Sequence, residues 1–250
     1  MNKLISGALL GLVQGLTEFL PVSSSGHLAI LQHYLKFPGD RLFFDVMLHF
    51  ATLLSVLVYF RRRIVEYLRS PRILSYIVLV TIPTGIVGLL LKEKVEVLIR
   101  APKIIAIMLL ITAFITFLVD KIEGTKKIEE LGSTGALFVG VFQGLAVIPG
   151  ISRSGSTIFA SVIAGVDKEE AAPFSFIVSI PAIAGATLLE TLKLGNHTAQ
   201  LDAATLVGMT VAFATGLAAI KIFVETLRTR RFRLFSAYLI AAALAVLLAG

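Results

Sequence analysis

The sequence predicts an all-α integral membrane protein in which six transmembrane helices and two re-entrant helix–loop–helix hairpins form an inverted-topology repeat. Three observations lead to this fold class. Hydrophobic residues make up 56% of the 250 residues and charged residues only 16%, whereas about a quarter of a soluble domain is charged. Several apolar stretches are long enough to cross a bilayer, and one polar, broken motif occurs twice. Most of the surface therefore cannot face water.

The six predicted spans are apolar segments separated by charged clusters. A spanning helix needs about 20 mostly apolar residues. The segments that meet this requirement are residues 42–60, 73–91, 103–119, 172–192, 203–224 and 234–248. The chain has no cysteine, which excludes disulfides and thiolate metal sites. Its net charge of +7 is attributed to orientation in the membrane, with no nucleic-acid partner expected.

Two further apolar stretches, residues 4–35 and 137–164, do not fit simple spans. Each is too long for one helix and too short for two spans with a loop, and each is interrupted near its middle by proline, glycine and several serines. Non-helical backbone at membrane depth is tolerated only where protein or a water-filled cavity satisfies its polar groups. We therefore predict two re-entrant hairpins, with a pair of kinked spanning helices as the alternative.

The two hairpins are related copies. The segment Gly11-Leu-Val-Gln-Gly-Leu16 matches Gly140-Val-Phe-Gln-Gly-Leu145, which lies 129 residues later. The chain then divides into repeat one, residues 1–128, and repeat two, residues 129–250, each with one hairpin and three spans. Because three is odd, the second repeat is expected to lie upside down relative to the first. Inverted repeats of this kind place their binding site near the bilayer midplane, at the repeat interface.

The distribution of basic residues predicts the orientation. One face collects thirteen lysines and arginines and the other eight. The richer face holds residues 61–72, 120–136, 165–171 and 227–233. By the positive-inside rule the richer face is cytoplasmic. Both termini and the mouth of the first hairpin then lie outside, and the second hairpin enters from the cytoplasm.

The first hairpin carries the residues best suited to catalysis. Gln14 and Glu18 are four residues apart and share one helix face. Pro21 is expected to end that helix. The serines after it are expected to cap the next helix, whose free N–H groups form an anion site. Glu18 and His27 are ionisable residues inside apolar sequence, which indicates function. The structural alternatives are a buried Glu18 neutralised by an arginine, and serines that only cap.

The second hairpin lacks the glutamate and histidine and supplies Arg153, whose planar guanidinium suits phosphate. Gly150 and Gly155 permit close backbone approach, and the neighbouring hydroxyls would complete an anion cradle. His49 follows Asp45 by four residues and could either line the site or pair with Asp45. If the loops meet, a hydroxyl beside a base would face fixed positive charge. Nucleophilic phosphoryl transfer requires this combination.

These motifs resemble the undecaprenyl-diphosphate phosphatase family, integral-membrane enzymes linked to bacitracin resistance. The similarity rests on Gly15–His27 and Pro149–Thr157, is supported by Phe44–His49 and Phe174–Pro181, and covers nearly the whole chain. It implies hydrolysis of a C55 polyprenyl diphosphate to the monophosphate and inorganic phosphate, which recycles the lipid carrier for cell-wall glycans. It also implies action at the outer side of the cytoplasmic (inner) membrane and dependence on Mg²⁺ or Ca²⁺.

The resemblance also assigns roles to residues. Its catalytic positions fall on Glu18, Ser24, His27 and Arg153. Ser24 corresponds to the proposed nucleophile and His27 to its rival. Many members carry glutamate where this chain has Gln14, so Glu18, with Gln14 as a carbonyl donor, is the candidate metal ligand. His49 is an additional candidate. The expected phosphate-binding residues are Ser23, Ser25, Gly26, Ser152, Ser154, Gly155 and Thr157.

Two other functions remain as alternatives. A polyprenyl-phosphate transporter or flippase is compatible with inverted repeats and broken helices. A structural membrane scaffold would leave the buried Glu18 and Arg153 unexplained. The serine cluster beside Glu18 and His27 favours the enzyme. The expected partners are the bilayer and a polyprenyl diphosphate lipid, with a homodimer as the candidate assembly.

Overall fold

The computed structural model describes residues 2–37, 40–194, 201–227 and 232–249, and within these ranges every named element is helical. Among the described residues, six helices are long and apolar enough to cross a membrane, which confirms the six predicted spans. Their bounds are α3 Arg41–Tyr59, α5 Pro71–Leu98, α6 Pro102–Lys121, α9 Lys168–Leu194, α10 Ala203–Leu227 and α11 Phe232–Ala249.

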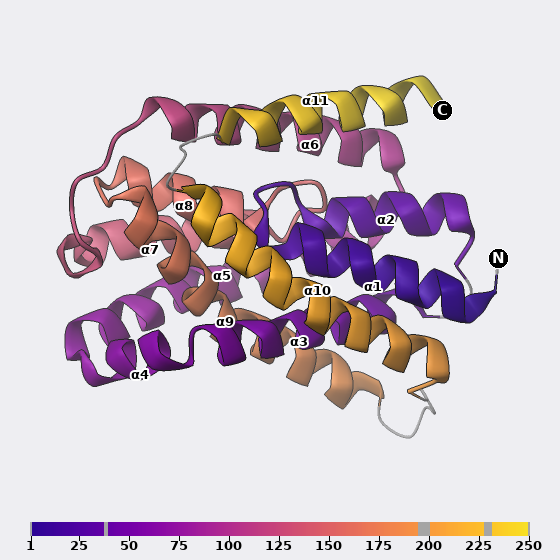
Figure 1. The fold of residues 1–250 in the computed structure, drawn as a ribbon, viewed down its shortest axis with the longest axis horizontal. Coiled ribbons are helices and arrows are strands. Elements are labelled where there is room, and N and C mark those ends of the chain that lie inside the picture. Colours follow the sequence, from indigo (N-terminus) through magenta and orange to yellow (C-terminus); the bar gives the residue numbers. More distant parts are fainter. Residues whose placement is uncertain (1, 38–39, 195–200, 228–231, 250) are drawn as a thin grey trace.

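Two pairs of shorter helices occupy the predicted hairpin positions: α1 Lys3–Phe19 with α2 Ser24–Leu35, and α7 Gly132–Leu145 with α8 Arg153–Ile163. The breaks fall at the predicted residues, with Ser23 and Ser152 as N-caps of α2 and α8. In Figure 1 the first pair extends from one end of the molecule and the second from the other, and their loops meet near the middle. The depth of these pairs in a bilayer and the inverted repeat stay predictions.

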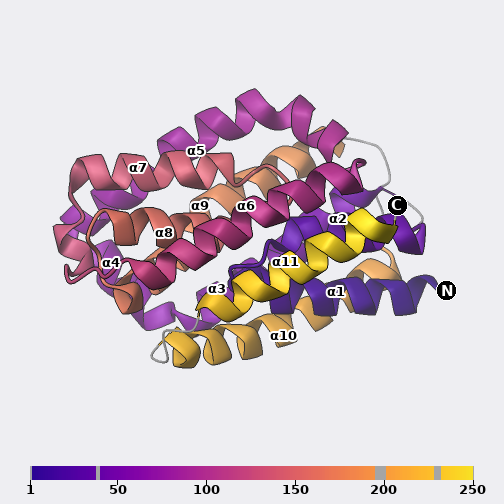
Figure 2. The same ribbon diagram turned by 90° about the horizontal axis from the view of Figure 1, so that it is seen from above.

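The two ends of the molecule differ in the segments they collect. One end holds the short helices α4 Arg61–Arg69 and η1 Ile128–Glu130, while the start of α1 and the end of α11 lie at the other (Figures 1 and 2). The basic segments that predict the orientation therefore gather at one end. Arg228, Arg230 and Arg231, which are part of that prediction, lie outside the described residues. The sequence did not predict α4, whose only buried residue is Tyr67.

Helix α6 anchors both loops through two threonines one turn apart. Thr112 Oγ1 donates to the Gly150 carbonyl at 2.7 Å and accepts from the Ser152 N–H at 3.0 Å. The single hydroxyl proton of Thr116 has two acceptors, the Thr112 carbonyl at 2.7 Å and the Pro21 carbonyl at 3.3 Å. Irregular backbone in apolar surroundings must find such partners. These threonines were not predicted from the sequence, and they satisfy backbone groups that the two loops leave free.

Small residues allow close contact where each hairpin packs on the opposite half of the chain. Gly7, Gly11 and Gly15 of α1 face backbone atoms of α10, while on α7 Gly140 faces the Val80 backbone of α5 and Gly144 faces the Val87 side chain. Lipid tails are as apolar as leucine, so helices in a membrane associate through close van der Waals packing. The glycine spacing of four therefore fixes the position of each hairpin.

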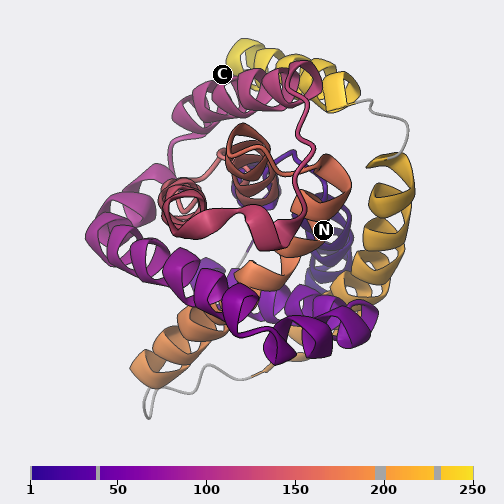
Figure 3. The same ribbon diagram turned by 90° about the vertical axis from the view of Figure 1, so that its left-hand side faces the viewer.

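Helix α8 lies in the interior of the molecule. Seen end-on in Figure 3, other helices lie on several sides of α8. Every α8 residue from Ser154 to Val162 is buried. This placement carries Arg153, the first residue of α8, to the centre of the protein.

Candidate functional site

A cavity of about 270 Å³ lies where the two loops meet α3, α5 and α9. One part of its wall is polar and consists of Glu18, Ser23, Ser24, Ser25, Asp45, His49, Thr84, Gln143, Ser152, Arg153, Ser179 and Thr187. The remaining wall is apolar. The cavity therefore combines residues of both hairpins with residues of three spans.

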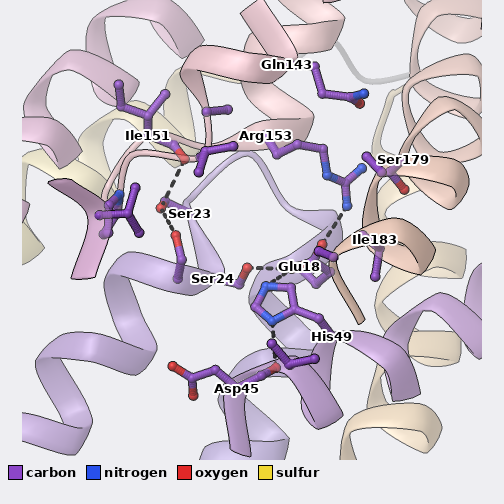
Figure 4. Close-up of a pocket in the computed structure, with 18 of the residues that line it drawn as sticks. Glu18, Ser23, Ser24, Asp45, His49, Gln143, Ile151, Arg153, Ser179 and Ile183 are labelled. Carbon is purple, nitrogen blue, oxygen red and sulfur yellow. Dashed lines mark hydrogen bonds and ion pairs between the residues drawn. The ribbon is translucent and has the colours of Figure 1, made fainter. Parts of the chain in front are cut away.

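The Glu18 carboxylate lies at the centre of the polar wall (Figure 4). It is only 6% exposed. Its Oε1 accepts from Arg153 Nη2 at 2.5 Å, and its Oε2 accepts from Ser24 Oγ at 2.5 Å. The last residues of α1, the first residue of α2 and the first residue of α8 thus meet at one carboxylate. Charge-assisted contacts of this length are strong.

Two further side chains approach the same carboxylate. Gln14 Nε2 donates to Glu18 Oε2 at 3.0 Å, as their spacing on α1 predicts. His49 Nε2 lies 3.5 Å from Glu18 Oε2, and its Nδ1 is 2.8 Å from the Asp45 carbonyl. A carbonyl can only accept, so Nδ1 carries a proton, and Nε2 is the ring nitrogen that faces the carboxylate. His49 thus lines the site, as one of its two predicted alternatives required.

The structural alternative for Glu18 is realised in part, because Arg153 does neutralise it. Pairing alone does not account for Ser24, whose hydroxyl donates to the same carboxylate while both residues line the cavity. A hydroxyl on a carboxylate, beside a guanidinium, is the arrangement of an activated nucleophile next to an anion-binding group. The geometry therefore allows Glu18 both to form a structural ion pair with Arg153 and to activate the Ser24 hydroxyl.

The predicted phosphate-binding residues divide into two groups. Ser23, Ser25 and Ser152 line the cavity. Ser154 instead donates to the Leu20 carbonyl at 3.1 Å, and Thr157 contacts Ser175. The other two, Gly26 and Gly155, donate their N–H groups to the capping serines Ser23 and Ser152. Four of the seven predicted residues thus connect loops and helices and do not line the cavity.

His27 does not line the cavity. Its Nδ1 lies 2.8 Å from the Ser23 carbonyl, and its Nε2 lies 2.8 Å from the hydroxyl of Tyr238 on α11. The two rings stack with centroids 5.6 Å apart. The structure thus brings Glu18, Ser24 and Arg153 together and leaves the fourth predicted catalytic residue outside their contacts.

Several cavity residues were not predicted to lie in the site. Asp45 accepts from Gln32 Nε2 at 2.6 Å, and an acidic residue inside a predicted span is itself a signal of function. Gln143 donates to Thr84 Oγ1 at 3.1 Å. It occupies the position of Gln14 in the second repeat, so the repeat alignment could have identified it. Ser179 lies within Phe174–Pro181, one of the supporting motifs of the resemblance, which could have identified it.

The residues of the site do not by themselves make a complete divalent-cation site. The described part of the chain contains no cluster of three or more His, Cys, Asp or Glu side chains that could hold a metal ion. Both Glu18 oxygens already accept hydrogen bonds, while Gln14 Oε1 is buried and has no hydrogen-bond partner among the described residues. Mg²⁺ commonly uses one or two carboxylates and completes its shell with substrate phosphates and water. The donor set fits only a cation shared in this way.

Comparison with known proteins gives a consistent family. The family model described as bacitracin resistance protein BacA matches residues 7–245. A relative from Desulfosudis oleivorans is 42% identical over 94% of each chain, and one from Halothermothrix orenii is 41% identical over 96% of each. A relative from Desulforapulum autotrophicum is 39% identical over 99% of each chain. All three carry the name undecaprenyl-diphosphatase.

Proposed function

The chain belongs to the family described as bacitracin resistance protein BacA, and we propose that it hydrolyses undecaprenyl diphosphate to undecaprenyl phosphate and inorganic phosphate. This reaction regenerates the lipid carrier for cell-wall glycan synthesis. One observation carries the proposal beyond family membership. The Ser24 hydroxyl lies 2.5 Å from Glu18 Oε2, and Arg153 contacts the other oxygen of the same carboxylate. Nucleophile, base and phosphate-binding group thus converge in one cavity.

In the first step Ser24 Oγ attacks the terminal phosphorus of the diphosphate. The bond from Oγ to phosphorus forms, the bond from that phosphorus to the bridging oxygen breaks, and Glu18 takes the hydroxyl proton. The bridging oxygen stays with undecaprenyl phosphate, which leaves. Catalysis of phosphoryl transfer depends mainly on positioning and on positive charge near the equatorial oxygens. Arg153, whose side chain is 16% exposed at the cavity, supplies that charge.

In the second step a water molecule replaces the lipid phosphate and attacks the phosphoserine. The bond from phosphorus to Ser24 Oγ breaks, and inorganic phosphate leaves. Glu18 returns its proton to Oγ and accepts a proton from the attacking water. The product phosphate then takes this second proton from Glu18. The sum is one water consumed for each diphosphate cleaved.

The apolar part of the cavity wall supports a lipid substrate. It includes Leu42 and Val46 of α3, Val95 of α5, and Ile183 and Ala186 of α9. A cavity of about 270 Å³ is at the lower end of small-ligand pockets. It has room for the head group but not for a long prenyl chain. The diphosphate therefore binds at the polar wall and the prenyl chain leaves along the apolar wall into the bilayer.

The membrane setting and the cation belong to the same proposal. The multi-pass chain lies in the cytoplasmic membrane and acts on the lipid head group from the outer side. Glu18, with the buried Gln14 Oε1 as a neutral oxygen that has no hydrogen-bond partner among the described residues, would hold a divalent cation, Mg²⁺ or Ca²⁺, together with the substrate. When bound, such a cation neutralises phosphate charge. The homodimer stays a prediction.

The test is phosphate release by the purified, detergent-solubilised protein, measured with undecaprenyl diphosphate and with shorter prenyl diphosphates. We expect turnover by the wild type and large losses in Glu18→Gln and Arg153→Ala. The folding of each variant is checked by thermal unfolding, since breaking a buried ion pair can destabilise by about 3–5 kcal/mol. An inactive wild type would overturn the proposed reaction. Undiminished turnover in both variants would overturn the site.

The same preparation separates the enzyme from the transporter. Reconstituted in liposomes, a transporter would move polyprenyl phosphate across the bilayer without releasing phosphate. The contact between Ser24 and Glu18 favours hydrolysis, because transport alone needs no activated hydroxyl. We therefore expect phosphate release to accompany any lipid movement.

A further inference from the structure

We infer that His27 is a positioning residue that acts through the backbone of Ser23, and that Tyr238 of α11 is the second member of this device. Together they hold the turn that presents Ser24 to Glu18. The inference rests on the proposed function for its kinetic readout. It differs from the role suggested by sequence resemblance, in which His27 competes with Ser24 as the nucleophile.

Both nitrogens of the His27 ring are already occupied. Nδ1 lies 2.8 Å from the Ser23 carbonyl oxygen, and because a carbonyl can only accept, Nδ1 carries the proton. In the neutral ring Nε2 is then the acceptor. The Tyr238 hydroxyl, 2.8 Å away, donates to it. The rings also stack with an angle of 9° between their planes. Neither nitrogen is left to contact the substrate or the Ser24 hydroxyl.

The residue that His27 holds has an unusual backbone. Ser23 has a φ of 66°, in the left-handed region, which residues other than glycine rarely adopt. Such a conformation persists only where surrounding contacts enforce it. The Ser23 carbonyl accepts from the His27 ring and also from the His27 backbone N–H at 3.2 Å. The side chain of Ser23 accepts from the Gly26 N–H and donates to the Ile151 carbonyl.

This turn determines the position of the proposed nucleophile. Ser24 directly follows Ser23 and is the first residue of α2, and its Oγ lies 2.5 Å from Glu18 Oε2. A change in the dihedral angles of Ser23 would move Ser24 relative to Glu18. Misplacement of a reacting group by about 1 Å can cost on the order of 10²-fold in rate. His27 can thus be essential for turnover without touching the substrate.

Tyr238 connects the turn to the bundle. It lies on α11, which packs on α6, and α6 holds both loops through Thr112 and Thr116. The Tyr238 hydroxyl lies 2.8 Å from His27 Nε2, although the residue itself is 49% exposed. The turn is therefore linked through Tyr238 and α11 to α6, the helix that also holds the two loops.

Two substitutions at one position distinguish positioning from chemistry. The amide nitrogen of asparagine occupies the place of Nδ1, so His27→Asn can still donate to the Ser23 carbonyl. Glutamine places its amide nearer to Nε2, so His27→Gln loses that bond. We expect His27→Asn to keep kcat within about fivefold of the wild type and His27→Gln to lose about 10²-fold in kcat with little change in KM. Loss on the order of 10⁴-fold in both variants, as expected of a nucleophile, would overturn the inference.

A spectroscopic measurement tests the same contacts without relying on activity. In ¹⁵N-histidine NMR of the full-length protein, His27→Asn identifies the His27 signal, which we expect to show the tautomer protonated at Nδ1. Tyr238→Phe, which keeps the stacked ring but removes the hydroxyl, should shift the Nε2 resonance and lower kcat several-fold. A His27 protonated at Nε2, or one unaffected by Tyr238→Phe, would overturn the inference. An inactive wild type with the expected tautomer would overturn the proposed function alone.

Discussion

Glu18 is the residue on which the site depends. It accepts from Arg153, Ser24 and Gln14, and His49 approaches within 3.5 Å. Removal of one partner from a buried ion pair leaves an uncompensated charge and costs about 3–5 kcal/mol. Single substitutions here therefore affect both stability and turnover, and kinetic experiments need variants that preserve the pair. Ser24 and Gln14 can be changed without removing either charge.

Ser24→Ala is expected to abolish the covalent step and to lower kcat by on the order of 10⁴-fold or more, as removal of a nucleophile does in other hydrolases. The pair of Glu18 and Arg153 stays intact, so the melting temperature should change little. Phosphate release and thermal unfolding measure the two effects. Ser161→Ala is the control, because Ser161 is also buried but, among the described residues, its hydroxyl donates to the Thr157 carbonyl of its own helix and not to Glu18. Activity retained by Ser24→Ala would remove the phosphoserine from the mechanism.

Gln14→Glu is expected to increase the affinity for the divalent cation. The new carboxylate would lie beside Glu18, where Gln14 Nε2 now sits 3.0 Å from Glu18 Oε2, and two adjacent carboxylates bind hard cations better than one. The measurement removes bound metal with EDTA and then adds back Mg²⁺ or Ca²⁺. The cation concentration at half-maximal turnover should be about tenfold lower in Gln14→Glu than in the wild type, the typical size of an effect of ligand surroundings on metal affinity. An unchanged cation requirement would place the ion away from Gln14.

At the scale of elements, α6 supports the site without contributing a catalytic group. Thr112 and Thr116 satisfy backbone groups of both loops, and a buried group that loses its partner costs about 1–3 kcal/mol. The glycines of α1 and α7 set how closely the hairpins approach α10 and α5. The loops can meet only because threonines and glycines occupy these positions.

Thr112→Val should destabilise the protein and lower turnover, because the Gly150 carbonyl and the Ser152 N–H both lose their partner. We expect a loss of about 1–3 kcal/mol, seen as a lower melting temperature. The control is Thr210→Val, at an exposed threonine whose hydroxyl, among the described residues, donates to the Leu206 carbonyl of its own helix, so stability should be nearly unchanged. Equal effects of the two substitutions would contradict a role of Thr112 in holding the loop.

Gly11→Ala should disrupt the packing of α1 on α10. A Cβ at Gly11 would lie 2.9 Å from Gly208 Cα, a contact with backbone that cannot rotate away. Forcing extra volume into a packed contact typically costs about 1–3 kcal/mol. Gly85→Ala in α5 meets no atom within 4 Å and should be neutral or stabilising by up to about 1 kcal/mol. Thermal unfolding in one detergent compares the two, and a Gly11→Ala as stable as Gly85→Ala would contradict the close contact.

For the whole molecule, orientation decides which membrane surface the site serves. The basic segments of the described chain gather at the end that carries α4, and the start of α1 and the end of α11 lie at the opposite end (Figure 1). The cytoplasmic leaflet attracts basic segments. The end that carries α4 is therefore expected in the cytoplasm, and the opposite end outside.

Cysteine labelling tests this orientation directly, since the chain has no native cysteine. Glu66 of α4 and Glu93 near the end of α5 are both exposed and lie toward opposite ends of the structure. In intact cells a membrane-impermeant maleimide should label Glu93→Cys and leave Glu66→Cys unlabelled until the membrane is permeabilised. The reverse pattern would place the basic end outside.

The sequence by itself determined the features that depend on local composition. Apolar length identified the six spans, and proline with serine predicted the breaks near residues 21 and 149, because hydropathy and backbone constraints act within one segment. It also identified the charged residues of both motifs. From the sequence, the pairing of Glu18 with Arg153 could be predicted only as a contact between the two repeats, since these residues are 135 positions apart.

Only the tertiary structure decided which polar side chains enter the cavity. Ser24 and His27 are three residues apart, a spacing that places them on neighbouring sides of α2. Their contacts nevertheless diverge, since Ser24 reaches Glu18 and His27 reaches Tyr238 on α11. His49 takes the position beside the carboxylate, and Thr112 and Thr116 hold the loops. The direction of each side chain depends on partners from distant segments, and helix packing, which local sequence does not encode, brings those partners together.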